Sequence, residues 1–103
     1  MPLTRDFKAT VRNRAEKDPE FRSALLVEAV QALIDGEPDV TKCVLRDYIN
    51  ATLGFDQLSR EVRIPKKSIM RMLSDSGNPT TKNMTLILAH LNKYEGLRLR
   101  VSR

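Results

Sequence analysis

Four basic side chains lie close together in the middle of the chain, at Arg63, Lys66, Lys67 and Arg71, and no acidic residue separates them. Lysine supplies a mobile point charge, whereas arginine supplies a planar guanidinium that binds two acceptors at once. Clustered positive charge of this kind is what contact with the phosphates of a nucleic acid requires. The next question is which elements would present these residues on one surface.

Apolar residues around the basic cluster are spaced as in two short helices joined by a turn. Pro65 has the φ of a first helical turn and lacks an N–H, so the second helix is expected to begin at about Lys66. The apolar positions recur at intervals of three and four, with one in the connection, and can pack into one wedge between crossed helices. This spacing predicts a helix-turn-helix over residues 55–73. The wedge consists of Leu58, Val62, Ile64, Ile69 and Met72.

The second of these helices would face outward with its polar side. Residues at such positions are those with which a recognition helix reads the major groove of DNA. Arg71 is the candidate for base recognition, because a guanidinium pairs bidentately with guanine. A surface ion pair with Asp75, one turn on, is the alternative for Arg71. The predicted DNA-binding residues are Arg63, Lys66, Lys67, Met70, Arg71 and Ser74.

The other outward residues also have two interpretations each. Lys66 and Lys67 either contact phosphates or are solvated, since lysine lacks planar geometry. Met70 either touches a thymine methyl group or fills a gap in packing. Arg63, in the turn, can add a phosphate contact.

Charge is distributed unevenly along the 103 residues, whose formal net charge is +5. Residues 1–17 carry five basic and two acidic side chains, whereas residues 18–47 carry three basic and seven acidic ones. From 55 to 76 the balance is five against three, and from 77 onward five against one. The basic C-terminal half favours contact with nucleic acid, and the acidic segment is left for another role.

The segment from Leu58 onward resembles a known family over roughly half of the chain. The motif consists of Ser68-Ile69-Met70-Arg71-Met72-Leu73-Ser74, the turn Gly77-Asn78-Pro79, a last helix with Met84 to Leu91, and the tail Gly96 to Val101. It is similar to the Xre/Cro-type helix-turn-helix, and to the HigA-like antidote proteins of toxin–antitoxin modules. Two positions depart from the family pattern. Ser59 stands where the family usually has Ala, and Arg63 where the turn usually has Gly, at a cost of about 1 kcal/mol if φ is positive.

The resemblance implies an antitoxin that neutralises a toxin encoded beside it and represses their shared promoter. A homodimer would place one recognition helix in each half-site of a palindromic operator, with half-site centres about ten base pairs, or a multiple, apart. The acidic segment from Asp18 to Asp47 is the candidate surface for a cognate toxin. A solitary Xre-type repressor, or a helical interaction module that does not bind DNA, would have the same sequence features.

Helix-capping residues, prolines and glycines divide the rest of the chain into helices. Thr4 to Lys17 is amphipathic with a basic outer face, and Asp18 is the expected N-cap of a helix that starts at Pro19 and runs to about Ile34. Its apolar set is broader than one buried stripe, so the helix-turn-helix core or a partner should cover the surplus. Residues 35–38, Asp-Gly-Glu-Pro, mark the main boundary, between an N-terminal helical segment (1–36) and a DNA-binding domain (37–103) in one compact unit.

The third helix is expected over Pro38 to about Leu53, with a buried face that holds Val40, Val44, Leu45, Tyr48, Ile49 and Leu53. Gly54 should end it, and Thr80 or Thr81 should cap the last helix, which Gly96 ends. The resulting fold is all-α: five to six helices, with a lambda-repressor-like helix-turn-helix and a short C-terminal β-strand.

The strand is predicted for residues 97–101, where apolar and basic residues alternate strictly. A lone strand cannot satisfy its own backbone, so two copies would pair their tails across a dimer axis, or a partner protein would supply the second strand. A tail packed irregularly on the body is the alternative. The expected dimer or partner contacts are Leu97, Leu99 and Val101.

Catalytic and metal chemistry have no motif in this sequence. Cys43 is the only cysteine, which excludes an intrachain disulfide and suggests a reducing compartment. His90 is the only histidine and is expected to be structural, because no metal-ligand spacing accompanies it. No apolar run approaches the length of a membrane span or of a signal peptide. We therefore expect a cytoplasmic protein that is neither an enzyme nor dependent on a metal or cofactor.

Overall fold

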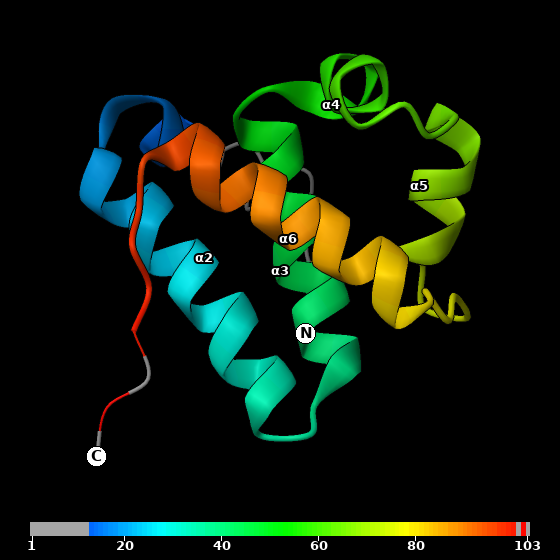
Figure 1. Cartoon of the computed structure of the whole chain (residues 1–103). Helices are drawn as coiled ribbons and strands as arrows, with labels where there is room; N and C mark the ends of the chain where they lie inside the picture. The colour runs from blue at the N-terminus through cyan, green and yellow to red at the C-terminus, as the bar shows by residue number, and fades with distance from the viewer. Residues whose placement is uncertain (1–12, 101, 103) are drawn as a thin grey trace.

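A computed structural model describes residues 13–100 and 102, and within them the chain is helical with short connections and no strand (Figure 1). Residues 13–17 are helical, which agrees with the C-terminal end of the helix expected over Thr4 to Lys17; residues 4–12 of that helix lie outside the described residues. An all-α class is therefore confirmed for the described part of the chain. The further helices are α2 (Pro19–Ile34), α3 (Pro38–Ala51), α4 (Gly54–Val62), α5 (Lys66–Met72) and α6 (Thr81–Glu95).

Capping residues fix the start of α2 and both ends of α6 where the sequence predicted them. The Asp18 carboxylate accepts hydrogen bonds from the backbone N–H groups of Glu20 and Phe21 at 3.1 and 3.2 Å. The Thr80 hydroxyl oxygen accepts from Asn83 N–H at 3.1 Å. Each cap satisfies backbone donors that the first turn of a helix leaves unpaired. Gly96, at φ 72°, ends α6 in the left-handed conformation.

The third helix ends earlier than predicted. It stops at Ala51 rather than Leu53, and Thr52 and Leu53 form a turn before Gly54, at φ 79°, begins α4. The Thr52 hydroxyl donates to the Tyr48 carbonyl at 2.7 Å, which satisfies an acceptor at the end of the helix. Val40, predicted on the buried face, is exposed, because the first turn of α3 directs Thr41 toward α2 instead, where its hydroxyl donates to the Ala29 carbonyl at 2.9 Å.

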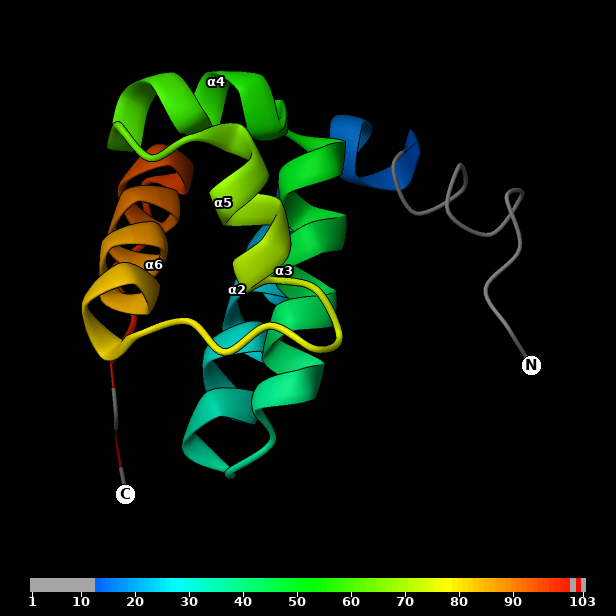
Figure 2. The same cartoon turned by 90° about the vertical axis from the view of Figure 1, so that its right-hand side faces the viewer.

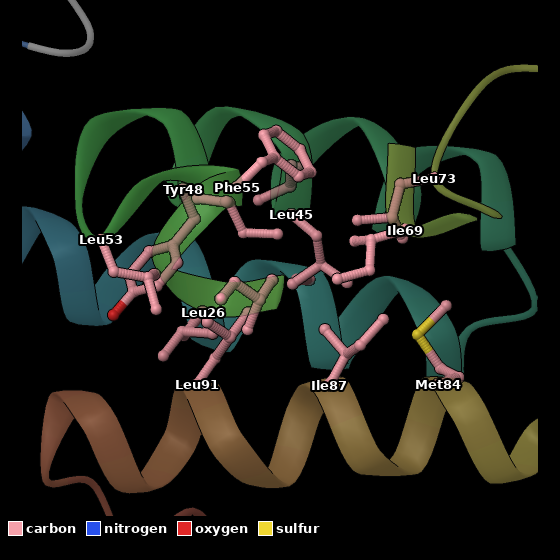
Figure 3. Close-up of a cluster of buried hydrophobic side chains, with 14 residues drawn as sticks. Leu26, Leu45, Tyr48, Leu53, Phe55, Ile69, Leu73, Met84, Ile87 and Leu91 are labelled. Atoms are coloured by element: carbon pink, nitrogen blue, oxygen red, sulfur yellow. The ribbon is translucent and has the colours of Figure 1, made fainter. Parts of the chain in front are cut away.

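One hydrophobic cluster joins all five helices (Figure 3). α2 packs on α3 and α6, and α4 packs on α3, α5 and α6. Leu58 and Ile69 of the predicted wedge are fully buried, and its other three members are half-buried against the same cluster. Burial is thus confirmed for two of the five wedge residues, and the other three lie only partly in the core. The fully buried aliphatic side chains are Leu26, Leu45, Ile49, Leu58, Ile69, Leu73, Ile87 and Leu91.

A buried polar group ties three helices together at one end of this core. The Tyr48 hydroxyl of α3 donates to Glu95 Oε1 of α6 at 2.6 Å, and Arg22 Nε of α2 approaches the same oxygen at 3.1 Å. Arg22 also donates to the Ala15 carbonyl at 2.9 Å. Burial, and then the hydrogen bond to Glu95, raise the pKa of the Tyr48 hydroxyl, so Tyr48 stays a neutral donor.

The prediction of a C-terminal strand over residues 97–101 is wrong for residues 97–100, the part of it that the structure describes. Leu97 to Arg100 have no regular structure, and Val101 lies outside the described residues. Leu97 N–H donates to the Asn92 carbonyl, and the Asn92 side chain donates back to the Leu97 carbonyl, both at 3.1 Å. The tail therefore starts bonded to the end of α6, and Leu97 packs against the core.

Helix α2 keeps part of its apolar surplus exposed. Leu26, Ala29 and Ala32 form its buried face, and of these the sequence prediction had included only Ala29. Val27, Leu33 and Ile34 are exposed, with Ile34 at 60%. The core thus covers only one side of the helix, as expected for a helix that lies at the surface.

Candidate nucleic-acid interface

The basic cluster is presented by α4, α5 and the three residues between them; Figure 2 shows α4 along the top and α5 below it, in front of α3. Phe55 and Leu58 bury one face of α4 in the core. Ile69 and Leu73 do the same for α5. Since α5 is only seven residues long, this burial, rather than intrinsic helix stability, holds it in place.

The connection is closed by a residue in the left-handed conformation. Arg63 has φ 59° and ψ 41°, and its N–H donates to the Ser59 carbonyl at 2.9 Å. The Ser59 hydroxyl donates to the Ile64 carbonyl at 2.6 Å. Ser59 and Arg63, the two positions that depart from the motif that this sequence resembles, therefore take part in the same turn. Pro65 follows as the N-cap, and its carbonyl accepts from Ser68 N–H and Ile69 N–H.

The outer side of α5 carries four of the predicted site residues. Lys66, Lys67 and Arg71 are exposed, and Met70 is 46% exposed. An exposed Met70 does not fill a packing gap within this chain. Ser74, just after the helix, is half-buried, and its hydroxyl donates to the Arg71 carbonyl at 2.6 Å. Ser74 therefore already has an acceptor within the protein.

Two carboxylates modify the charge of this surface. Asp56 of α4 lies 3.1 Å from Lys66 Nζ, which neutralises part of the lysine charge. Asp75 lies 3.3 Å from Arg46 Nη2, so the acid considered as an alternative partner of Arg71 is bound to a different arginine. Among the ion pairs of the described residues, none involves Arg63, Lys67 or Arg71.

Two basic residues of α3 hold the segment that follows α5, and sequence reasoning did not single them out. Lys42 is buried, and its ammonium donates to the carbonyls of Asp75 and Gly77 at 3.1 and 2.8 Å. Arg46 donates to the Leu73 carbonyl. The only sequence signal for this role is a pair of basic residues four positions apart on the predicted third helix. The signal is weak because the acceptors are main-chain carbonyls far along the chain.

Gly77 packs closely under the end of α5. A Cβ added there would lie 2.1 Å from the Arg71 carbonyl oxygen and 2.5 Å from that of Met72. Both contacts are with backbone, which cannot move aside as a flexible side chain would. The glycine of the Gly-Asn-Pro turn is therefore required for close approach to the helix that carries Arg71.

His90 links the other side of α4 to α6. Its Nε2 lies 2.8 Å from Glu61 Oε1, and the Gln57 amide donates to the other oxygen of the same carboxylate at 3.0 Å. The hydrogen bonds from Gln57 and then from His90 lower the pKa of Glu61. This contact gives His90 a structural partner between two helices. Cys43 is half-buried on α3.

Comparison of the chain with protein-family models, with curated proteins and with solved structures found no match. Within the described residues, the helices are too short or too polar to cross a lipid bilayer. The assignment of function therefore depends on the geometry and charge of the surface formed by α4, residues 63–65 and α5.

Proposed function

We propose that the chain is a sequence-specific DNA-binding transcriptional regulator, in which α4, residues 63–65 and α5 act as a lambda-repressor-like helix-turn-helix. One observation carries this proposal. A short helix buries Ile69 on one side and exposes Lys67 and Arg71, outside the observed ion pairs, on the other. Such a helix can enter a major groove without losing its contacts to the core.

The proposed roles follow from the chemistry of each side chain. Arg71 reads a guanine edge, since its guanidinium is exposed and Asp75 is bound by Arg46. Lys67 and Arg63 contact phosphates and so fix the position of α5 on the duplex. Lys66 contributes once phosphate oxygens replace Asp56 as its partner. Met70 supplies an apolar contact with a thymine methyl group.

Two protomers related by a two-fold axis would bind a palindromic operator. Each α5 would enter one half-site, with the half-site centres about ten base pairs, or a multiple, apart. Dimerisation also doubles the number of phosphate contacts, which a single short helix needs for useful affinity.

An antitoxin that represses the promoter of its own toxin–antitoxin module is the more specific form of this proposal. The sequence resemblance supports it, and so does the exposure of Val27, Leu33 and Ile34 inside the acidic segment from Asp18 to Asp47. An apolar surface with an acidic surround suits a basic toxin. A solitary repressor, or a helical interaction module that has no DNA target, would use the same fold.

Selection from a pool of random duplexes with the purified full chain tests the function. We expect an enriched palindrome, and affinity for it that falls steeply and linearly in a plot of log K against log salt concentration. A protein that binds every duplex equally and only slightly at moderate salt is an interaction module, and the proposal would then be abandoned.

A further inference from the structure

A groove of about 320 Å³ opens between the end of α2, the start of α3 and the first half of α6. Its apolar lining comes from Leu33 of α2 and from Met84 and Leu88 of α6, with Pro38 and Pro79 at its edges. Leu33 is 38% exposed and Leu88 is half-buried. The volume is several times that of one water molecule, so the groove can accept side chains.

The charge around this groove is mainly negative. Asp39 lines it, and Glu37 and Asp35 are exposed in the adjoining α2–α3 connection. Lys42 also lines the groove, where it forms an ion pair with Asp39 at 3.3 Å and donates to two backbone carbonyls, so the excess negative charge comes from Asp35 and Glu37. The groove therefore suits an occupant that combines aliphatic and cationic side chains.

The tail after α6, residues 97–103, has this composition. Arg98 and Arg100 alternate with Leu97, Leu99 and Val101. Leu99 is 39% exposed, and both arginines are exposed. In Figures 1 and 2, residues 97–100 leave the end of α6 and run toward the end of the molecule that carries the α2–α3 connection.

The described residues of the tail do not occupy the groove of their own chain. None of residues 97–100 lines it, and Leu99 remains exposed. The backbone of Leu97 is held at the end of α6 by Asn92, which fixes the starting point of the tail.

We propose that the groove between α2, α3 and α6 binds the Leu97–Val101 tail of a second copy of this chain, and that reciprocal exchange of the two tails makes the dimer. Leu99 and Val101 enter the apolar groove, and Arg98 and Arg100 meet Glu37 and Asp39. This contact removes both Leu33 and Leu99 from solvent. It deepens the proposed function, which requires a dimer, but its test contains no DNA.

Reversed charges provide the test, with sedimentation velocity of the full chain as the measurement. One variant carries Arg98→Glu and Arg100→Glu, and the other carries Glu37→Lys and Asp39→Lys. Each variant alone places like charges at both contacts, so the Kd for self-association should rise at least about tenfold. An equimolar mixture places opposite charges at both contacts and should dimerise like the unmodified chain.

Aspartate substitution of two equally exposed leucines provides a matched pair of variants. Leu99→Asp should abolish dimerisation, whereas Leu86→Asp, on the face of α6 beside α4, should leave it unchanged. Circular dichroism melting of every variant shows whether it is folded. This pair keeps the inference testable if a lysine beside Lys42 prevents folding.

Three results would overturn the inference: an unmodified chain that is monomeric, a Glu37→Lys/Asp39→Lys variant that dimerises normally, or a mixture that stays monomeric. Normal dimerisation of that variant would indicate tails that pair with each other. A monomer that still selects a DNA sequence would refute tail exchange and the dimer, but not sequence-specific DNA binding. A tail-exchanged dimer that selects no sequence would refute the DNA-binding function alone.

Discussion

The hydroxyl of Ser59 donates a 2.6 Å hydrogen bond to the main-chain carbonyl of Ile64, across the turn that joins α4 to α5. The carbonyl of the same serine accepts the N–H of Arg63 at 2.9 Å. Ser59 thus holds both ends of the connection, and it allows a non-glycine residue at φ 59° to be kept in place.

Replacement of Ser59 by alanine should lower the free energy of unfolding by about 1 kcal/mol, because the Ile64 carbonyl loses its only side-chain donor among the described hydrogen bonds. Urea unfolding of the full chain measures this change. Ser76→Ala, at an exposed position, is the control and should change the free energy by less than about 0.5 kcal/mol. Equal effects of the two substitutions would show that the Ser59 hydrogen bond contributes nothing.

Replacement of Arg63 by glycine should separate stability from binding. Glycine adopts φ 59° without the cost that a Cβ imposes, so the free energy of unfolding should rise by up to about 1 kcal/mol. Loss of one phosphate contact in each protomer, and so of two per dimer, should weaken binding to all duplexes and reduce the slope of log K against log salt by about 1.8. Arg63→Ala should show the same loss of binding without the gain in stability, and unchanged binding by both variants would place Arg63 outside the DNA interface.

Local signals in the sequence predicted the ends of most helices. Asp18, Thr80 and Gly96 act within one turn of the residues they cap, so their neighbours in the sequence are sufficient to identify them. Burial of the wedge between residues 58 and 72 was also predictable, since the spacing of apolar residues records which face of a helix is inward.

Contacts between distant residues could not be predicted in the same way. The buried ammonium of Lys42 donates hydrogen bonds to two main-chain carbonyls 33 and 35 residues away. Every residue has a main-chain carbonyl, so the sequence does not indicate which ones act as acceptors. The tail alternates like a strand, but a strand also needs a neighbouring backbone, and Leu97 bonds to Asn92 at the end of α6 instead.

Removal of the Tyr48 hydroxyl should destabilise the junction of α2, α3 and α6. Tyr48→Phe leaves Glu95, whose side chain is 7% exposed, with Arg22 but without its 2.6 Å donor. A hydrogen bond to a charged group contributes about 1.5–3 kcal/mol, so the free energy of unfolding should fall by about that amount. Urea unfolding measures it, with Tyr94→Phe at a 46% exposed position as the control. Equal stability of the two variants would contradict a structural role for the Tyr48–Glu95 contact.

Arg71 and Lys67 should differ in the kind of binding energy that they supply. Arg71→Ala should cost about 1–3 kcal/mol per half-site of the selected operator and relax the base preference at one position in each half-site, because a bidentate contact with guanine is lost. Lys67→Ala should weaken binding to every duplex by the same factor and leave the preferred sequence unchanged, since a phosphate contact carries no base information. Fluorescence anisotropy with the operator and with single-base variants of it measures both.

Arg71→Lys is the matched control for this pair, because it keeps the charge and removes the planar fork. If Arg71 reads a base, the lysine variant should lose sequence preference while it keeps its affinity for unrelated duplexes. Full preference in the lysine variant would mean that Arg71 acts through its charge alone. The base that α5 reads would then have to be contacted by Met70, Lys66 or Lys67, the other exposed side chains of the helix.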